Sequence, residues 1–182
     1  VTVTVNPLAA VPSSVTATPP AICLGFSSNL SAVSAGNTIN WFLATSGGFS
    51  QGSSASGGNF SVSPTSTTIY YAGAVTPAGC PSPSRTPVTV TVNALPTPTF
   101  VSPTTVVCQN VPGIVYTTQS GQSNYQWTIT GGTITSGGGP TNNTATVTWT
   151  SAGTGTIRVN YTNSNGCTAV SPTAQNVTVN PQ

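Results

Sequence analysis

Very few side chains in this sequence can take part in chemistry. Its 182 residues include two arginines and four cysteines but no Asp, Glu or His. General acid–base catalysis needs a group whose pKa lies near the working pH, usually a His or a carboxylate, and an activated nucleophile needs such a neighbour too. Metal sites lose their usual carboxylate and imidazole ligands for the same reason. The composition therefore predicts a protein that is not an enzyme and has no metal or other cofactor.

The two positive charges, Arg85 and Arg158, are too few for a nucleic-acid surface, which needs a stripe of basic residues. Arg158 lies between two hydrophobic strand residues, and Arg85 lies in a Pro-rich stretch, so we expect both to be solvated surface charges. No apolar run approaches the ~18 residues that a membrane-spanning helix requires. The sequence therefore predicts neither nucleic-acid binding nor membrane insertion.

The sequence repeats itself. The peptide Val-Thr-Val-Asn occurs at residues 3–6, 90–93 and 177–180, at an interval of 87 residues. Such self-similarity is typical of tandem domains. Because each repeat ends in this peptide, the first copy is interpreted as the end of a preceding repeat, and the chain as a slice of an array. The other recurring residues are Cys23 with Cys108, Trp41 with Trp127, and Cys80 with Cys167.

Within each repeat, hydrophobic and polar residues alternate with a period of two, which is typical of strands with one buried face. Gly and Pro separate short runs rich in Val and Thr, and no stretch has a 3.6-residue period. Such strands around a central Trp are typical of immunoglobulin-type sandwiches. The sequence predicts an all-β protein of two tandem immunoglobulin-like β-sandwich domains, residues 7–94 and 95–182. Residues 1–6 are predicted to be the terminal strand of a preceding repeat or a donor strand.

The alternation also predicts which side chains face the core. Phe42 and Tyr70 fall on the opposite parity from the core residues, so we expect them to be exposed and available for contacts. All three tryptophans have inward parity, which favours core packing over a sugar-stacking platform. The residues predicted to face inward are Ile39, Trp41, Leu43, Phe60, Val62, Ile69, Tyr71, Val88, Val90 and Val92 in the first repeat, and Tyr125, Trp127, Ile129, Ala145, Val147, Trp149, Ile157, Val159, Tyr161, Val177 and Val179 in the second.

Several motifs resemble repeats of large surface proteins of Bacteroidota. In the first repeat, Ile-Cys-Leu-Gly at 22–25, the run at 63–71, Gly79-Cys80 and the run at 88–93 resemble their Ig-like repeats. In the second, the runs at 124–129, 147–150 and 160–167 resemble their PKD-like repeats, although the turn at 163–165 lacks the Asp that relatives usually carry. Such repeats occur in long adhesins and filament proteins exported by the type IX secretion route. The resemblance implies an extracellular, bacterial cell-surface protein without catalytic residues.

In an exported chain, four cysteines predict two disulfides. The equivalence of the repeats favours Cys23–Cys80 and Cys108–Cys167, and closing a loop of roughly 57 residues stabilises a domain by about 4 kcal/mol through chain entropy. In a simple Ig topology, however, these two positions lie toward opposite ends of the sandwich, so an inter-repeat bond such as Cys23–Cys167 stays open. Free or metal-binding thiols are a further alternative.

The near absence of charge leaves little repulsion between copies, and strand edges without Lys or Glu lack a common protection against edge pairing. We therefore expect self-association into a filament or array. The predicted function is a non-catalytic structural and adhesive repeat module of a bacterial extracellular filament or cell-surface adhesin, with a glycan or other surface ligand as a further partner. The alternatives are a carbohydrate-binding module of a secreted multidomain protein and an inert stalk.

Overall fold

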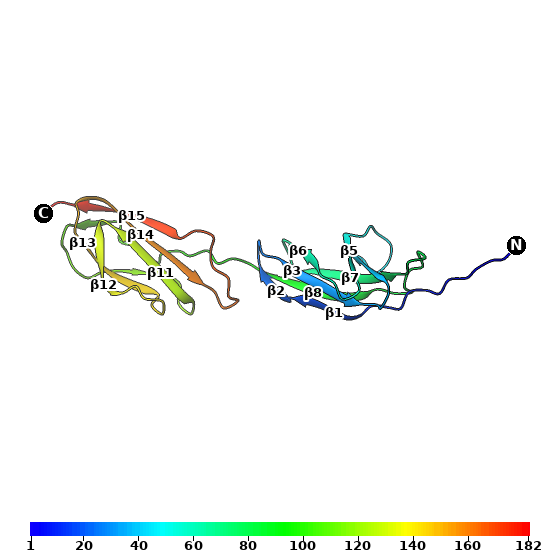
Figure 1. Cartoon of the computed structure of the whole chain (residues 1–182). Coiled ribbons are helices and arrows are strands. Elements are labelled where there is room, and N and C mark those ends of the chain that lie inside the picture. Colours follow the sequence, from blue (N-terminus) through cyan, green and yellow to red (C-terminus); the bar gives the residue numbers. More distant parts are fainter. The chain divides into compact units, whose positions relative to one another are not determined.

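The computed structural model describes residues 1–182 and consists of strands and connecting segments (Figure 1). It divides into two compact units, Val1–Asn93 (unit 1) and Ala94–Gln182 (unit 2), with the boundary one residue before the expected one. None of its segments forms a helix of the length and hydropathy that crossing a membrane requires. The predicted all-β fold is confirmed.

Unit 1 is a sandwich of two sheets. The smaller sheet has the order β1-β3-β6, and the larger has the order β2-β8-β7-β4-β5. All neighbouring strands are antiparallel except β2 and β8, which are parallel. The strands are β1 Ser13–Thr18, β2 Ala21–Cys23, β3 Ser28–Val33, β4 Thr38–Phe42, β5 Gly52–Ala55, β6 Phe60–Val62, β7 Thr68–Val75 and β8 Thr86–Asn93.

The core of unit 1 combines a few large side chains with small ones. Leu30 of the smaller sheet and Trp41 of the larger sheet are fully buried and belong to one hydrophobic cluster, which also includes three strand alanines. The Trp41 ring stacks on Phe60, with ring centroids 6.4 Å apart. Gly52 lies under Phe60, where a Cβ would overlap the ring. The two sheets therefore enclose a single core around Trp41.

Unit 2 is a sandwich of the same kind with seven strands. Its smaller sheet has the order β10-β13-β12 and its larger sheet the order β11-β14-β15-β9, in which only β15 and β9 are parallel. The strands are β9 Val106–Cys108, β10 Ile114–Thr117, β11 Ser123–Thr130, β12 Gly132–Gly137, β13 Thr144–Trp149, β14 Gly153–Thr162 and β15 Thr173–Asn180.

Aromatic side chains fill much of the unit 2 core. Trp149 meets Tyr116 edge to face, with ring centroids 6.1 Å apart, and its Nε1 donates a hydrogen bond to the Tyr116 hydroxyl at 3.2 Å. Tyr125 and Tyr161 form a second edge-to-face pair at 5.8 Å. A Cβ on Gly155 would overlap the Trp149 ring, so this strand position accepts only glycine without rearrangement. The core is packed closely enough that one methyl group matters.

The predicted facing is confirmed throughout the second repeat and is wrong in part of the first. Every inward residue predicted for unit 2 is buried or half-buried. In unit 1, Leu43 lies beyond the end of β4 and is exposed, and Ile69 is exposed too. In β7, Ala72 pairs with buried Trp41, and directly opposed residues share a face of the sheet. Tyr70 therefore points inward with Ala72, and the large Tyr71 takes the outer face.

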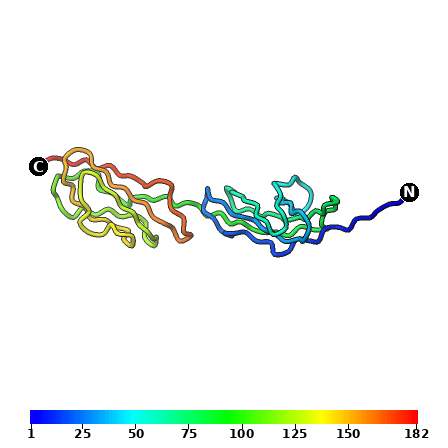
Figure 2. Tube along the Cα trace, in the orientation of Figure 1, coloured from blue at the N-terminus to red at the C-terminus, as the bar shows by residue number.

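The last two Val-Thr-Val-Asn copies complete their own units. The copy at 90–93 lies in β8 between β2 and β7, and the copy at 177–180 lies in β15 between β9 and β14. Both strands are thus paired on both edges inside one sheet. Residues 1–12 form no strand, and Figure 2 shows the start of the chain as an extended segment. From Ala9, which is buried in the unit 1 core, the chain joins the sandwich.

Candidate functional site

The cysteines require a correction of the sequence-based pairing. Cys80 and Cys108 are free thiols, whereas Cys23 and Cys167 are each disulfide-bonded. The predicted bonds Cys23–Cys80 and Cys108–Cys167 are therefore not formed. One partner of each predicted pair is bonded and the other is free.

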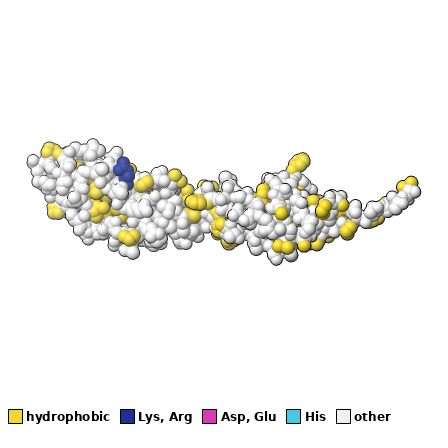
Figure 3. Space-filling view, in the orientation of Figure 1, with side chains coloured by type: hydrophobic (Ala, Val, Ile, Leu, Met, Phe, Trp, Pro, Cys, Tyr) yellow, Lys and Arg dark blue, Asp and Glu magenta, His cyan; other side chains and the backbone are white.

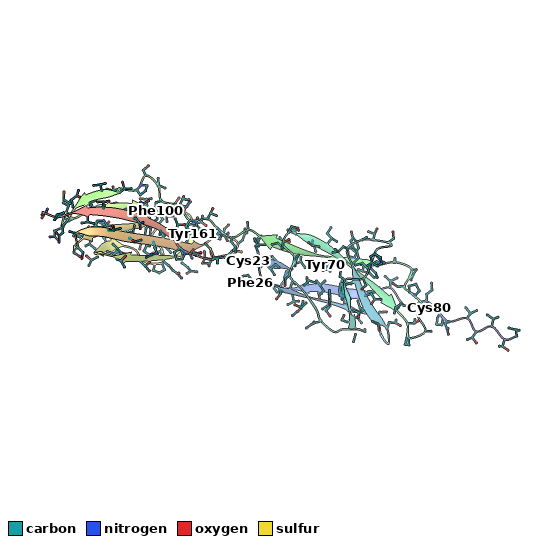
Figure 4. All side chains as sticks on the ribbon, turned by 90° about the horizontal axis from the view of Figure 1, so that it is seen from above. Cys23, Phe26, Tyr70, Cys80, Phe100 and Tyr161 are labelled. Carbon is teal, nitrogen blue, oxygen red and sulfur yellow. The ribbon has the colours of Figure 1, made fainter.

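The reason is that the two cysteines of a repeat lie at opposite ends of its sandwich. Cys23 pairs in register with Asn93, the last residue of β8, whereas Cys80 lies in the turn before β8 begins. Figure 4 labels both residues, at opposite ends of unit 1. An eight-residue strand is about 26 Å long, whereas a disulfide needs Cα atoms within about 7 Å of each other. In unit 2, β15 separates Cys108 from Cys167 in the same way.

The two aromatic residues predicted to be exposed have different surroundings. Tyr70 is only 7% exposed, so its prediction as a contact residue is wrong. Phe42 is half-buried, and the guanidinium carbon of Arg85 lies 3.3 Å from its ring centroid. A cation over an aromatic face is attracted by the ring quadrupole. The outer face of Phe42 is therefore covered by Arg85 and is closed to a sugar ring.

Arg85 is not the solvated charge that its sequence context predicts. Its Nη1 donates hydrogen bonds to the backbone oxygens of Ala44 at 2.7 Å and Gly47 at 2.8 Å. Both acceptors lie in the connection between β4 and β5, about forty positions earlier in the chain. Arg85 thus ties this connection to the sheet through two charge-assisted hydrogen bonds and the Phe42 ring. Arg158, by contrast, is exposed as predicted.

We call the β4–β5 connection, residues 43–51, the apolar loop. Its side chains include Phe49, which is 92% exposed, and Leu43, which is 52% exposed. Gly47 and Gly48 have φ angles of 62° and 71°, which glycine adopts without strain. Ser50 Oγ accepts a hydrogen bond from the Gly52 amide, and the Gln51 amide bonds Trp41 O at 2.7 Å. Hydrogen bonds at both ends therefore hold an apolar tip out into solvent.

Sequence reasoning missed this loop as a site. The alternation that predicts Ile39 and Trp41 as buried also assigned Leu43 to the core, although β4 ends at Phe42. The available signal was Gly47-Gly48 followed by an aromatic residue among serines, because such glycines mark a tight turn. Phe26, in the turn after β2, is a second exposed aromatic residue at 65% and was also missed.

Beside the apolar loop there is a hollow of about 280 Å³. It lies next to β4 and β7, and its lining includes Asn40, Phe42, Gly73, Ser82 and Arg85. Ligand cavities in proteins usually measure roughly 300–1,000 Å³, so this one is small. Apart from the arginine its lining is neutral, so it can accept hydrogen-bonding groups, and the hydroxyl groups that line it have no carboxylate or imidazole beside them.

No part of the structure brings together three or more metal-ligating side chains of the His, Cys, Asp and Glu types. The groups with shifted acidity are tyrosines. Burial raises the pKa of Tyr70, Tyr116 and Tyr161 above the ordinary tyrosine value, and Tyr125 adds to the effect at Tyr161. Figure 3 shows a largely uncharged face with one basic spot over unit 2.

Comparison with known families identifies the first repeat. Residues 10–94 match the family described as "Ig-like domain CHU_C associated". The match covers nearly all of unit 1, which is therefore an Ig-like domain, and domains of this kind are typically non-catalytic structural or binding modules. A disulfide is typical of oxidising compartments, so the bond and the family match together indicate an extracellular protein. Among curated proteins, none matches this chain.

Solved structures are similar to this chain at low identity and low TM-score. The fibronectin(III)-like modules of CbhA from Clostridium thermocellum are 20% identical, with a TM-score of 0.41, over 92% of this chain and 94% of that one. Domains 4 and 5 of the S-layer protein SbsC are 19% identical, with a TM-score of 0.35, over 65% and 69%. SGBP-B of the Bacteroides ovatus mixed-linkage glucan utilization locus is 19% identical, with a TM-score of 0.29, over 89% and 44%. At such scores the likenesses carry no argument about function.

Proposed function

We propose that this chain is a non-catalytic structural and adhesive segment of a bacterial extracellular filament or cell-surface adhesin, and that unit 2 is a PKD-like repeat within it. The observation that carries the proposal is the neutral surface: each unit has one arginine and no acidic residue. In unit 1 that arginine is engaged by Phe42 and by backbone oxygens. Two copies therefore meet with little electrostatic repulsion and with few ions to bury.

The strand edges support self-association. In unit 1 the outer strands of the larger sheet are β2 and β5, and in unit 2 they are β11 and β9. The sequence has no Lys or Glu to guard these edges. Unpaired backbone groups on an unprotected edge are ready to pair with another strand. The expected partner is therefore a further copy of the same repeats.

The apolar loop supports the adhesive part of the role. Phe49 is held out by a loop that Arg85 and Ser50 keep in place. A side chain presented by an ordered loop loses less conformational freedom on binding than one on a mobile loop. Burying a Phe side chain yields about 1.5–3 kcal/mol, so a few such contacts along an array suffice for adhesion.

Sedimentation velocity over a concentration series tests the proposal, with the free thiols of Cys80 and Cys108 alkylated so that no chain-to-chain disulfide forms and the bonded cysteines stay bonded. The weight-average sedimentation coefficient should rise with concentration. Phe49→Ala should weaken association about tenfold, since roughly 1.4 kcal/mol corresponds to a factor of ten. Val170→Ala is the matched control, because Val170 is 87% exposed but lies outside the apolar loop. A wild-type chain that stays monomeric at every concentration would contradict self-association.

A glycan array separates this role from that of a carbohydrate-binding module. All three tryptophans are buried and Arg85 covers the Phe42 ring. We therefore expect no specific glycan binding. A glycan signal that Phe49→Ala removes and Val170→Ala keeps would favour the carbohydrate-binding alternative. An inert stalk would show neither glycan binding nor self-association.

A further inference from the structure

The four cysteines occupy two kinds of position. The strand cysteines, Cys23 and Cys108, each end a short strand that runs parallel to the last strand of its unit. Cys23 pairs with Asn93 and Cys108 pairs with Asn180. In both units the next amide donates to that Asn oxygen, at 2.9 Å and 2.8 Å. The two strand cysteines therefore have the same backbone environment.

The turn cysteines, Cys80 and Cys167, close the turn before the last strand of each unit. The Cys80 amide donates to Thr76 Oγ1 at 3.0 Å, and the Cys167 amide donates to Asn163 Oδ1 at 3.0 Å. In the opposite direction, the amide of the Thr or Asn donates to the cysteine oxygen, at 3.0 Å and 2.8 Å. The two turn cysteines are thus held by the same hydrogen bonds.

One cysteine of each kind is bonded and the other is free. Cys23, a strand cysteine, and Cys167, a turn cysteine, are disulfide-bonded, while Cys108 and Cys80 are free. Because the backbone hydrogen bonds are the same within each kind, they do not explain the difference. What Cys108 and Cys80 lack is a partner. A partner inside the same repeat is excluded, because a whole strand separates the two positions.

Both kinds of cysteine lie beside the same residue of the repeat. Cys23 pairs with Asn93, which ends Val-Thr-Val-Asn at 90–93. The Sγ atom of Cys80 lies 3.9 Å from the backbone oxygen of Asn6, which ends the first copy of that peptide at 3–6. Taking residues 3–6 as the end of a preceding repeat, the Asn that ends a repeat lies beside the strand cysteine of its own repeat, as Asn93 does, and beside the turn cysteine of the following repeat, as Asn6 does.

We propose that the strand cysteine of each repeat forms a disulfide with the turn cysteine of the repeat that follows. The two bonded cysteines, Cys23 and Cys167, are one of each kind, as the proposal requires, and the free Cys108 and Cys80 are the positions at which further Ig-like repeats of this kind would be joined. Each bond forms from two thiols, which lose two protons and two electrons to a disulfide oxidant that becomes two thiols. The result is an array in which every junction is cross-linked. This inference does not depend on the adhesive role.

A tandem fusion of two full chains tests the proposal. Joining residue 180 of the first copy to residue 7 of the second lets 177–180 take the place of 3–6. After oxidative folding, the chains are denatured, their free thiols are alkylated and their intact mass is measured. Cys108 of the first copy should bond Cys80 of the second, so the fusion should carry two alkylated thiols, as many as one chain alone. Four alkylated thiols would overturn the proposal.

Cys108→Ser in the first copy is the matched control. It should raise the number of alkylated thiols from two to three, because Cys80 of the second copy loses its partner. If the thiols of the fusion do not pair, the same substitution lowers the number from four to three. The number therefore moves in opposite directions under the two outcomes.

Tryptic mapping reads the connectivity directly, because the chain has arginines only at 85 and 158 and no lysine. In the single chain the proposal predicts that peptide 1–85 is linked to peptide 159–182, and that Cys108 is alkylated in peptide 86–158. In the fusion, peptide 86–158 of the first copy should be linked to the peptide that contains Cys80 of the second. A link between peptides 86–158 and 159–182 in the single chain would restore the in-repeat pairing and overturn the proposal.

Discussion

Units 1 and 2 place their cysteines and their final strands alike, but they differ after the strand that contains the first tryptophan of the repeat. In unit 1 the apolar loop follows Trp41, and β5 then pairs back onto β4 in the larger sheet. In unit 2 the chain turns at Gly131 and β12 pairs with β13 in the smaller sheet. The ends that carry the cysteines are thus kept while the middle varies, as expected of the proposed array, whose joints are uniform and whose surface contacts differ.

The cores of the two units also differ. In unit 2, Trp149 packs between Tyr116 and the backbone of Gly155. Unit 1 instead stacks Trp41 on the half-buried Phe60 and uses alanines in its strands. Unit 2 therefore depends more on close aromatic packing. Substitutions in the two cores test this difference.

The largest effect is expected from Trp149→Ala. Removing a buried Trp costs about 3–5 kcal/mol of unfolding free energy, because its packing is lost and a cavity remains. Hydrogen exchange in a urea series should show loss of protection in β13 and β14, while β7 and β8 of unit 1 stay protected. Equal loss in both units would contradict the division into separate cores, and Trp41→Ala should give the mirror result.

Gly155→Ala should have the next largest effect. Its Cβ would overlap the Trp149 ring, and overpacking of a core costs about 1–3 kcal/mol. Gly139→Ala in the same unit is the control, because its Cβ would meet only the side-chain oxygen of Asn142 at 3.0 Å. Urea midpoints of unit 2 measure both variants. Equal midpoints would show that the Trp149 ring can shift and that the core is looser than described.

Arg85→Ala tests the difference between the two arginines. Without its hydrogen bonds to Ala44 and Gly47, the apolar loop should open more often. We expect its amides to exchange about tenfold faster, since a charged hydrogen bond is worth about 1.5–3 kcal/mol when buried and less at a half-exposed site. Arg158→Ala should change no exchange rate in unit 2 by a comparable factor. Unchanged amide exchange rates of the apolar loop in Arg85→Ala would contradict the claim that Arg85 holds this loop in place.

The smallest effect is expected from pH. With no Asp, Glu or His, stability should barely change between about pH 3 and pH 9. Burial raises the folded-state pKa of Tyr70, Tyr116 and Tyr161. Their contribution to the free energy of unfolding is therefore fully present below about pH 10, and it is lost as pH rises through the folded-state pKa values. Unit 2, with two such tyrosines, should lose more than unit 1 in alkali. A melting temperature that falls steeply between pH 3 and pH 9 would contradict this.

Large side chains explain where sequence reasoning succeeded. In β11 and β13 the inward positions hold Tyr125, Trp127, Val147 and Trp149, so the period of two is unmistakable. In β7 the inward positions after Tyr70 are Ala72 and Ala74, whereas bulky Ile69 and Tyr71 face out. Alternation read from residue size therefore fails there, and only pairing with β4 fixes the face.

The cysteine pairing and the contacts of Arg85 were harder to predict, because they depend on which segments the fold brings together or keeps apart. The equivalence of the repeats correctly groups Cys23 with Cys108 and Cys80 with Cys167, but it does not show that a strand's length separates the members of one repeat. Nor does any local pattern bring Arg85 to the oxygens of Ala44 and Gly47. The glycines of the apolar loop indicated a turn. However, the predicted alternation was continued to Leu43, so the end of β4 at Phe42 was missed.

Cryo-electron microscopy of the native parent protein on its cell surface tests the central claim most directly. The account predicts fibres or sheets in which sandwiches of this kind repeat and contact one another. Dispersed single molecules that make no contact with neighbours or with a surface would contradict it.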